Sequence, residues 1–383
     1  MNKRKIVSVT GSRAEYGLAS NVFRAIKNHP KLELSLIVTG MHLSDDFGYT
    51  IKEIEKDDFE IAAKLKILIA EDTNVAMAKS IGKCILQLVD VLEKIKPDIL
   101  LVLTDLSHSL AAAVVGTYMN ISIAHIHGGD VSGHVDEPVR HAITKLSHIH
   151  FPATKKSAER ILKMGEEPWR VLTVGTPSLD TILKQSFSTK KEVIEKFSLD
   201  TNQPLILVVQ HPVTMDTKNA AEQMKETMEA LKELNYQAIV IYPNADVGGR
   251  RMIKIINQYK KYPKIQTYKS LPYKDYLGVM NVANVMVGNS SSGIIEAPSF
   301  HLPFVNIGSR QKDRERSENV IDVNYDKEEI KEAIDKTFND KRFIEKVKKC
   351  KNPYGDGKTG ERIADILSKI KINSRLLEKR LTY

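Results

Sequence analysis

The sequence predicts an α/β protein made of two doubly wound domains with a ligand cleft between them. Short apolar runs alternate with longer amphipathic stretches along the chain. The short runs are apolar throughout, which is typical of strands in a parallel sheet covered on both faces. The same alternation restarts after a turn-rich segment at residues 175–180. A length of 383 residues also suits two domains of ordinary size better than one.

In the first half, the run IVSVT predicts the first strand, and a helix is expected from about residue 16 to 28. A longer helix at about 76–96 is expected to end before Pro97, since a proline disfavours helical geometry in the residue before it. The expected strands of this half are residues 6–10, 34–40, 99–105, 121–129, 149–154 and 171–177. We expect residues 1–178 to form the first domain.

The second half begins with a charged helix and turn at 184–203, followed by the apolar run LILVVQH. Its expected strands are residues 205–211, 237–244, 265–268, 285–291 and 303–308. We expect residues 179–365 to form the second domain. Residues 366–383 are expected to form a C-terminal helix that packs back on the first domain.

Composition excludes several classes of protein. No apolar run is long enough to span a bilayer, and IVSVT is too short for a signal peptide. Cys84 and Cys350 are too few for a disulfide framework or a cysteine zinc site, so we expect a cytoplasmic protein that binds no membrane. The net charge of +9 comes from dispersed lysines without a nucleic-acid-binding motif. A solvated basic surface explains most of it, and anionic small molecules are better candidate ligands than nucleic acid.

The candidate functional residues of the first half follow its strands, because ligands bind at the carboxyl ends of parallel strands. Arg13 stands at a helix start and can hold a phosphate, although a surface arginine beside a capping turn is an equal interpretation. His42 follows the second strand, where a lone histidine is more often structural. Asp105 ends a very apolar strand, which suits acid/base chemistry; the competing interpretation is an N-cap of the next helix.

The segment HIHGGDVSGHVDEPVRHAITKLSH, residues 125–148, is the richest in titratable side chains. His127 lies just past the fourth expected strand, and Asp130 follows a pair of glycines. Asp136 and Glu137 begin a helical stretch. The spacing, which includes a histidine at position 134, matches no common metal motif, so a metal site is the less favoured interpretation. The later histidines are expected to serve helix packing or a subunit contact.

In the second half, His211 ends the first strand, and the sequence GNSSSG joins a later strand to a short helix. Small hydroxyls and free backbone amides at such a junction form an anion site. Ser290 and Ser291 are therefore candidate phosphate ligands, and Glu296 is a candidate acceptor for ribose hydroxyls. A capped helix is the competing interpretation.

Together these motifs resemble one family. GSRAEYG, TGMHLS, HGGDVSGHVDEPVRHAITKLSH, VGTPSLD, QHPVT, GNSSSGIIEAPSF and NIGSRQKDRERSENVI are similar to motifs of the hydrolysing UDP-N-acetylglucosamine 2-epimerases, in the branch of the sialic-acid and legionaminic-acid pathways. The resemblance covers about residues 5–362. It implies a GT-B-like fold of two Rossmann-type domains, the second binding UDP. It also implies no cofactor and a homodimer or homotetramer.

The resemblance further implies a reaction at C2 of a UDP-linked 2-acetamido sugar. A base removes the C2 proton, UDP leaves from C1, and water adds to the resulting glycal to release the free C2-inverted sugar. UDP-N-acetylglucosamine, which gives N-acetylmannosamine, is the expected substrate. The alternatives are the same chemistry on UDP-N,N'-diacetylbacillosamine, and a non-hydrolysing epimerase. A GT-B glycosyltransferase and a non-catalytic nucleotide-sugar sensor also fit the fold class.

Residue by residue, the resemblance implies that Asp105, Asp136 and Glu137 are the acid/base carboxylates, with His127 and Asp130 at the sugar. The implied substrate-binding residues are Arg13, His211, Ser290 and Ser291 for the diphosphate, Glu296 for the ribose, Arg310 for the phosphates or sugar, and His42 for the sugar. Residues 270–276 are the implied uracil pocket. Family members often have arginine where Leu106 stands and glutamate where His127 stands, and these departures leave the sugar open between the two substrates.

Overall fold

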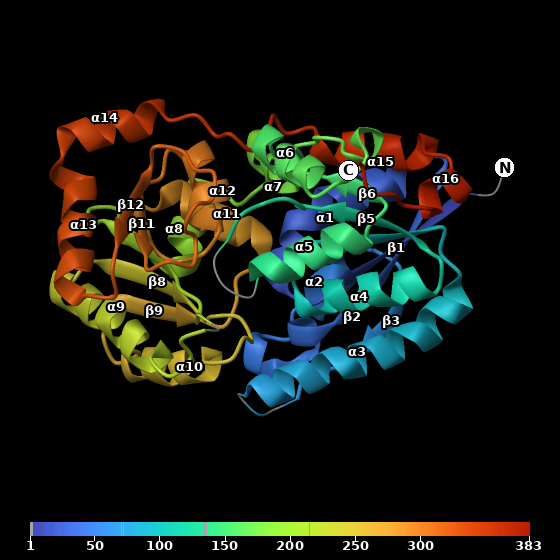
Figure 1. Cartoon of the computed structure of the whole chain (residues 1–383). Helices are drawn as coiled ribbons and strands as arrows, with labels where there is room; N and C mark the ends of the chain where they lie inside the picture. Colours follow the sequence, from blue (N-terminus) through green and yellow to red (C-terminus); the bar gives the residue numbers. More distant parts are fainter. Residues whose placement is uncertain (1–2, 70, 72, 133–135, 214) are drawn as a thin grey trace.

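The protein consists of two parallel six-stranded sheets with helices on both faces (Figure 1). The computed structural model describes residues 3–69, 71, 73–132, 136–213 and 215–383. All strand pairs in both sheets are parallel, as the continuously apolar runs predict.

The first sheet has the strand order β3-β2-β1-β4-β5-β6, the order of a dinucleotide-binding Rossmann fold. Its strands are β1 (Arg4–Thr10), β2 (Leu32–Thr39), β3 (Ile61–Leu65), β4 (Ile99–Leu103), β5 (Ser122–Ile126) and β6 (Ile149–Phe151). Its helices are α1 (Arg13–Asn28), α2 (Ile51–Lys56), α3 (Asn74–Ile95), α4 (Ser107–Tyr118), α5 (Asp136–Leu146), α6 (Lys155–Lys163) and α7 (Pro177–Leu183). One apolar cluster joins α1 to one face of this sheet, and another joins α3, α4 and α5 to the opposite face.

The second sheet, β12-β11-β10-β7-β8-β9, repeats this order when its strands are counted from β7. Its strands are β7 (Leu205–Val209), β8 (Gln237–Ile241), β9 (Ile265–Tyr268), β10 (Val285–Gly288), β11 (Phe304–Ile307) and β12 (Val320–Val323). Its helices are α8 (Lys190–Phe197), α9 (Ala220–Leu234), α10 (Gly249–Gln258), α11 (Tyr273–Val282), α12 (Ser292–Ile295), α13 (Lys327–Asn339) and α14 (Lys341–Lys349). Repetition of one strand order in both halves confirms the predicted pair of doubly wound units.

The end of the chain returns to the first sheet, where α15 (Thr359–Lys369) packs against α1 and α7 (Figure 1). Ile363 and Leu367 join the apolar cluster around α1, and so does Leu376 of α16 (Ser374–Leu377). The guanidinium of Arg170 donates to the carbonyls of Arg375 and Leu376 at 2.8 and 2.7 Å. These hydrogen bonds attach α16 to the first half of the chain. The domain limits at residues 178 and 365 stay a prediction.

Several elements differ from the sequence expectation. The helix expected at 366–383 is divided into the end of α15 and the short α16, with non-helical residues between and after them. The run at 171–177 forms only an isolated bridge between Val171 and His150. The amides of Leu172 and Val174 donate to the carbonyls of His150 and Pro152 at 2.9 and 3.1 Å, but Pro152 has no N–H to donate in return, so no ladder continues. Strands β3 and β12 were not expected from the sequence. Among the described residues, no helix has both the length and the apolar character needed to cross a membrane.

Candidate active site

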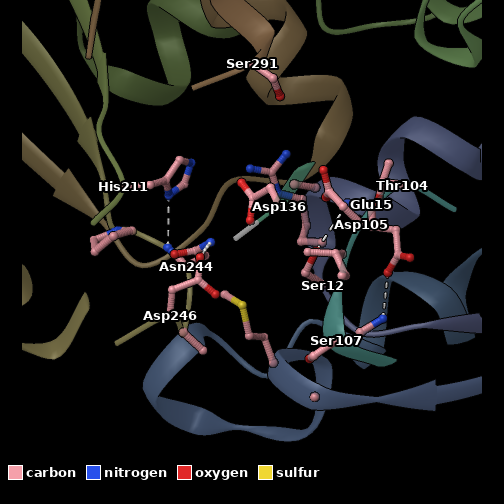
Figure 2. A pocket seen from close by; sticks show the side chains of 18 of the residues that line it. Ser12, Glu15, Thr104, Asp105, Ser107, Asp136, His211, Asn244, Asp246 and Ser291 are labelled. Atoms are coloured by element: carbon pink, nitrogen blue, oxygen red, sulfur yellow. Dashed lines mark hydrogen bonds between the residues drawn. The ribbon is translucent and has the colours of Figure 1, made fainter. Parts of the chain in front are cut away.

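The carboxyl ends of the two sheets face each other across a cavity of about 400 Å³ (Figure 2). Segments after β1, β4 and β5 line one side, and segments after β7, β8 and β10 line the other. The predicted site residues that line it are Arg13, Asp105, His127, Asp130, Asp136, His211, Ser290, Ser291, Glu296 and Arg310. His42 and Glu137 do not belong to the lining. Residues chosen because they follow the carboxyl ends of strands in both halves of the chain therefore line one cavity.

Asp105 is held by an arginine rather than by a helix end. The N-cap of α4 is Leu106, which makes no side-chain cap bond, so the capping interpretation of Asp105 is wrong. The carboxylate instead pairs with Arg140 of α5. Arg140 is 2% exposed and also donates to the carbonyl of Asp130 at 2.9 Å. One buried guanidinium thus fixes two segments of the cavity wall.

Two strand ends beside these carboxylates have an unusual backbone. Thr104, after β4, has a φ of 55°, and His127, after β5, has a φ of 65°. Left-handed geometry is uncommon for residues with a side chain, most of all for a β-branched threonine, and it costs about 1–3 kcal/mol per residue. The cost is offset by surrounding contacts, such as the 3.0 Å bond from the Thr104 amide to the Ile126 carbonyl. Strain of this kind concentrates at functional sites.

His127 and Asp130 form a buried pair. The ring Nδ1 lies 3.0 Å from Asp130 Oδ2, and the ring Nε2 lies 2.9 Å from the hydroxyl of Thr176. Burial opposes ionisation of Asp130, but the hydrogen bond from His127 and the charge of Arg314 outweigh it and keep the pKa of that carboxyl below its ordinary value. Ser157 also donates to Asp130 at 2.7 Å. An ionised carboxylate only accepts hydrogen bonds, so Nδ1 of His127 carries a proton and the ring is locked in place.

Asp136, at the start of α5, meets the second half of the chain. Its Oδ2 lies 3.1 Å from a guanidinium nitrogen of Arg310, which also donates to the carbonyl of Asn289 at 3.3 Å. Asp246, after β8, lines the second-sheet side of the cavity (Figure 2). Burial and the charge of Asp136 raise the pKa of Asp246 to about 6. Arg310 therefore connects the two sides of the cavity, and its charge acts on the carboxyl groups of both Asp136 and Asp246.

His211 presents one defined ring nitrogen to the cavity. Its backbone amide donates to Asn289 Oδ1 at 2.7 Å, and its ring Nδ1 accepts the Asn244 amide at 3.1 Å (Figure 2). Burial, with the nearby charges of Arg310 and Arg13, lowers the pKa of His211 to about 3, so the ring is neutral. Because Nδ1 is an acceptor, the proton resides on Nε2, which makes His211 a hydrogen-bond donor for an anion.

The serine segment after β10 supplies hydroxyls. Gly288 adopts a φ of 131°, and a Cβ there would lie 2.1 Å from the Val209 carbonyl oxygen. This close approach allows the chain to turn directly after the strand. The hydroxyls of Ser290 and Ser292 lie 2.9 Å apart, and Ser290 and Ser291 both line the cavity.

Arg13 reaches from the first half toward the second. Its Nε donates to the hydroxyl of Ser270 at 3.2 Å, and its guanidinium lies 4.9 Å from the centre of the Tyr276 ring. Glu296 accepts a hydrogen bond from the Tyr273 hydroxyl at 3.3 Å, and burial raises the pKa of this carboxyl to about 6. These contacts bring Ser270, Tyr273 and Tyr276 of the predicted uracil region, and Glu296 of the predicted ribose site, close to Arg13.

Two histidines play parts that differ from the simplest expectations. His108 lines the cavity and lies 2.8 Å from the buried carboxylate of Glu15, a pair that sequence reasoning missed. His42 is fully buried beneath the cavity, with its ring nitrogens bonded to Thr10 and Thr50, and burial lowers its pKa to about 3. His42 therefore does not line the cavity, and its hydrogen bonds join the end of β1 to Thr50 beside the site.

Glu137 is half-buried next to the site. It accepts the backbone amide of Ser132 at 3.1 Å and pairs with His141 at 3.6 Å. Within the described ranges, no group of three or more His, Cys, Asp or Glu side chains is arranged to hold a metal ion. His134, in the same segment, lies outside those ranges.

Further residues of the site could have been found by the same strand-end rule. Asn244 and Asp246 follow β8 within the sequence YPNAD and line the cavity. Their position directly after a strand is the sequence signal that identifies them. Arg140, by contrast, lies inside a helix, and nothing in its local sequence indicates its partner.

Two Rossmann-type sheets that enclose such a cavity define a two-domain protein of GT-B-like architecture. The family model described as UDP-N-acetylglucosamine 2-epimerase matches residues 24–368. The chain belongs to this family, which confirms the predicted family and fold.

Three related proteins match over most of the chain. The UDP-N,N'-diacetylbacillosamine 2-epimerase (hydrolyzing) of Legionella pneumophila is 40% identical over 380 residues, which cover 99% of this chain and 100% of that protein. The GDP/UDP-N,N'-diacetylbacillosamine 2-epimerase (hydrolyzing) of Campylobacter jejuni is 38% identical over 84% of this chain and 85% of that protein. The UDP-N-acetylglucosamine 2-epimerase of Neisseria meningitidis is 32% identical over 86% of each.

Solved structures agree on the fold. The UDP-GlcNAc 2-epimerase of Neisseria meningitidis, bound to UDP-GlcNAc, superposes with a TM-score of 0.81 over 96% of this chain and 100% of that chain, at 21% identity. The enzyme of Methanocaldococcus jannaschii, in complex with UDP-GlcNAc and UDP, gives a TM-score of 0.76 over 95% and 99% of the two chains, at 21% identity.

Proposed function

We propose that this chain is a hydrolysing 2-epimerase that converts UDP-N,N'-diacetylbacillosamine to UDP and the free C2-inverted sugar. The observation that carries the proposal is the cavity itself, which brings Asp105 and Asp136 of the first half together with the anion donors His211, Ser290 and Ser291 of the second half. The choice of sugar follows the relatives, since the two diacetylbacillosamine epimerases are 40% and 38% identical and the UDP-N-acetylglucosamine epimerase is 32% identical. UDP-N-acetylglucosamine, our first expectation from the sequence, is less well supported.

The second-domain side suits a diphosphate. The Nε2 proton of neutral His211 and the hydroxyls of Ser290 and Ser291 are donors without positive charge. Arg13 and Arg310 add positive charge from opposite sides of the cavity. Negative charge grows on UDP as the C1–O bond breaks, and preorganised donors in a secluded site stabilise it. We assign these five residues to the leaving group.

The first-domain side suits proton transfer at C2. In the elimination, a carboxylate takes the C2 proton, the C–H electrons form the C1–C2 double bond, and UDP leaves with the C1–O electrons. In the hydration, water adds its oxygen to C1 and C2 receives a proton on the opposite face. Inversion therefore needs groups on both faces of C2, and we assign them to Asp105 and Asp136. The His127–Asp130 pair lies beside them and is assigned to orienting the sugar or the water.

The test is release of UDP from the purified enzyme without any acceptor. Wild type is expected to release UDP from UDP-N,N'-diacetylbacillosamine. Asp105→Asn and Asp136→Asn should each lower kcat by 10²-fold or more while UDP still binds. Asp90→Asn, at an exposed position on α3, is the matched control and should be fully active.

Each alternative function has its own result in this assay. UDP release that needs an acceptor indicates a glycosyltransferase, and a product that keeps UDP indicates a non-hydrolysing epimerase. Binding without turnover of any UDP-linked 2-acetamido sugar indicates a sensor.

A further inference from the structure

We propose that an apolar wall in the cavity selects the sugar by its C4–C6 edge, favouring a 6-deoxy, 4-acetamido sugar over UDP-N-acetylglucosamine. The apolar wall consists of Met77, Ile81, Leu106, Leu110 and Val139, all of which line the cavity. This inference rests on the proposed function and adds to it the residues that recognise the substrate.

The apolar wall is formed by three elements that meet at the first-domain end of the cavity. Met77 and Ile81 come from α3, Leu110 from α4, and Val139 from α5. Ile81, Leu110 and Val139 pack against the apolar cluster on this face of the sheet, yet each keeps part of its surface exposed. Because they also line the cavity, that exposed surface is available to a ligand.

Its position relative to the carboxylates fixes which part of a sugar it meets. Leu106 directly follows Asp105, and Val139 directly precedes Arg140, so the wall begins at the Asp105–Arg140 pair. In a pyranose ring, C4 lies across the ring from C1. C5, which carries C6, lies across the ring from C2. A sugar whose C1 points to the diphosphate groups and whose C2 lies at the carboxylates therefore places its C4–C6 edge at the end of the cavity away from the diphosphate, where the wall extends beyond the Asp105–Arg140 pair.

The chemistry of the wall discriminates between the two candidate sugars. None of its five side chains carries a strong hydrogen-bond donor or acceptor. Against these five side chains, a hydroxyl at C6 of UDP-N-acetylglucosamine would lose water without gaining a hydrogen bond, whereas the C6 methyl of diacetylbacillosamine gains apolar contact. One methyl or methylene group in an apolar pocket changes kcat/KM by about 10-fold to 200-fold.

The test measures kcat/KM for three substrates: UDP-N,N'-diacetylbacillosamine, UDP-N-acetylglucosamine, and the 6-deoxy analogue of UDP-N-acetylglucosamine. The wall variants are Ile81→Gln and Val139→Thr. Val139→Thr is nearly isosteric, so it still tests the wall if Ile81→Gln fails to fold. The matched control is Ile85→Gln, one helical turn further along α3, where the side chain packs on the same cluster but does not line the cavity. Thermal unfolding of each variant checks that it is folded.

Wild type is expected to prefer both 6-deoxy substrates to UDP-N-acetylglucosamine by about tenfold or more. The wall variants should lower this preference by about tenfold, and Ile85→Gln should leave it unchanged. Equal losses of kcat/KM for all three substrates in the wall variants would overturn the inference, because the wall would then contact a part of the molecule that all three substrates share. Preference of wild type for UDP-N-acetylglucosamine would refute both the wall and the proposed sugar, yet leave hydrolytic epimerisation standing. Turnover of none of them would refute the proposed function and the inference together.

Discussion

The Asp105–Arg140 pair makes a sharp prediction about stability. In Arg140→Met the methionine keeps much of the apolar contact of the arginine stem, but Asp105 loses its counter-charge. The carbonyl of Asp130 also loses its 2.9 Å donor. The pair is well shielded from water, since the side chains of Arg140 and Asp105 are 2% and 15% exposed.

Breaking a buried ion pair on one side costs about 3–5 kcal/mol, because the remaining charge has no partner. We therefore expect Arg140→Met to lower the free energy of unfolding of the first domain by about 4 kcal/mol. The double variant Asp105→Asn/Arg140→Met removes both charges and should recover about 1–3 kcal/mol of that loss. The exposed pair of Arg24 and Asp57, 3.1 Å apart, is the control, and Arg24→Met should cost less than about 1 kcal/mol.

Urea unfolding, followed by circular dichroism, measures wild type, Arg140→Met, Asp105→Asn, the double variant and Arg24→Met. A loss below about 1 kcal/mol in Arg140→Met would show that the pair contributes no more than a surface contact. A double variant that is as unstable as the sum of the single variants would show that the two side chains do not interact. Either result would refute the idea that Arg140 holds Asp105 in place.

Three further predictions concern the second sheet. The pKa of Glu296 rises from an ordinary 4.5 to about 6, so the folded state binds its proton more tightly than the unfolded state does. The free energy of unfolding should therefore fall by about 2 kcal/mol as the pH rises from below 4.5 through 6. Glu296→Gln should lack this component, and urea-unfolding profiles against pH that are identical for wild type and variant would contradict the prediction. Ser290→Ala should weaken UDP binding roughly tenfold in isothermal titration calorimetry, and unchanged affinity would remove Ser290 from the phosphate site. Gly288→Ala should destabilise the protein by more than about 2 kcal/mol, since its Cβ would lie 2.1 Å from a carbonyl oxygen. Gly82→Ala, in α3 with nothing within 4 Å, should instead stabilise it by about 0.5–1 kcal/mol, and thermal unfolding of both variants decides.

Most of the fold could be predicted because parallel strands buried on both faces are apolar throughout. LILVV of β7 and ILLVL of β4 are examples, and both strands are wholly buried. The two missed strands lie at sheet edges, where one side has no neighbouring strand. IAAKL of β3 and VIDV of β12 are partly exposed and carry polar residues, so their patterns do not differ from those of loops. The expected strand at 171–177 was wrong because Pro152, just after β6, has no N–H for the ladder, which leaves only an isolated bridge.

The site could be predicted as a set of residues but not as a set of contacts. The carboxyl ends of parallel strands share one edge, so strand-end positions brought Asp105 and His127 to the same cavity. The partners of these groups depend on how helices pack. Arg140 is 35 residues from Asp105, and His108 is 93 residues from Glu15, and no local pattern joins either pair.

The central claim is that this cavity inverts C2 while it releases UDP, and proton NMR of the product formed in deuterated water tests it most directly. If Asp105 and Asp136 transfer protons at C2, the product is a free sugar of inverted C2 configuration with one solvent deuterium at C2, formed together with UDP. Asp105→Asn and Asp136→Asn should each suppress that exchange. A free sugar with retained configuration and no deuterium at C2 would contradict the account, because the C1–O bond would then break without proton transfer at C2.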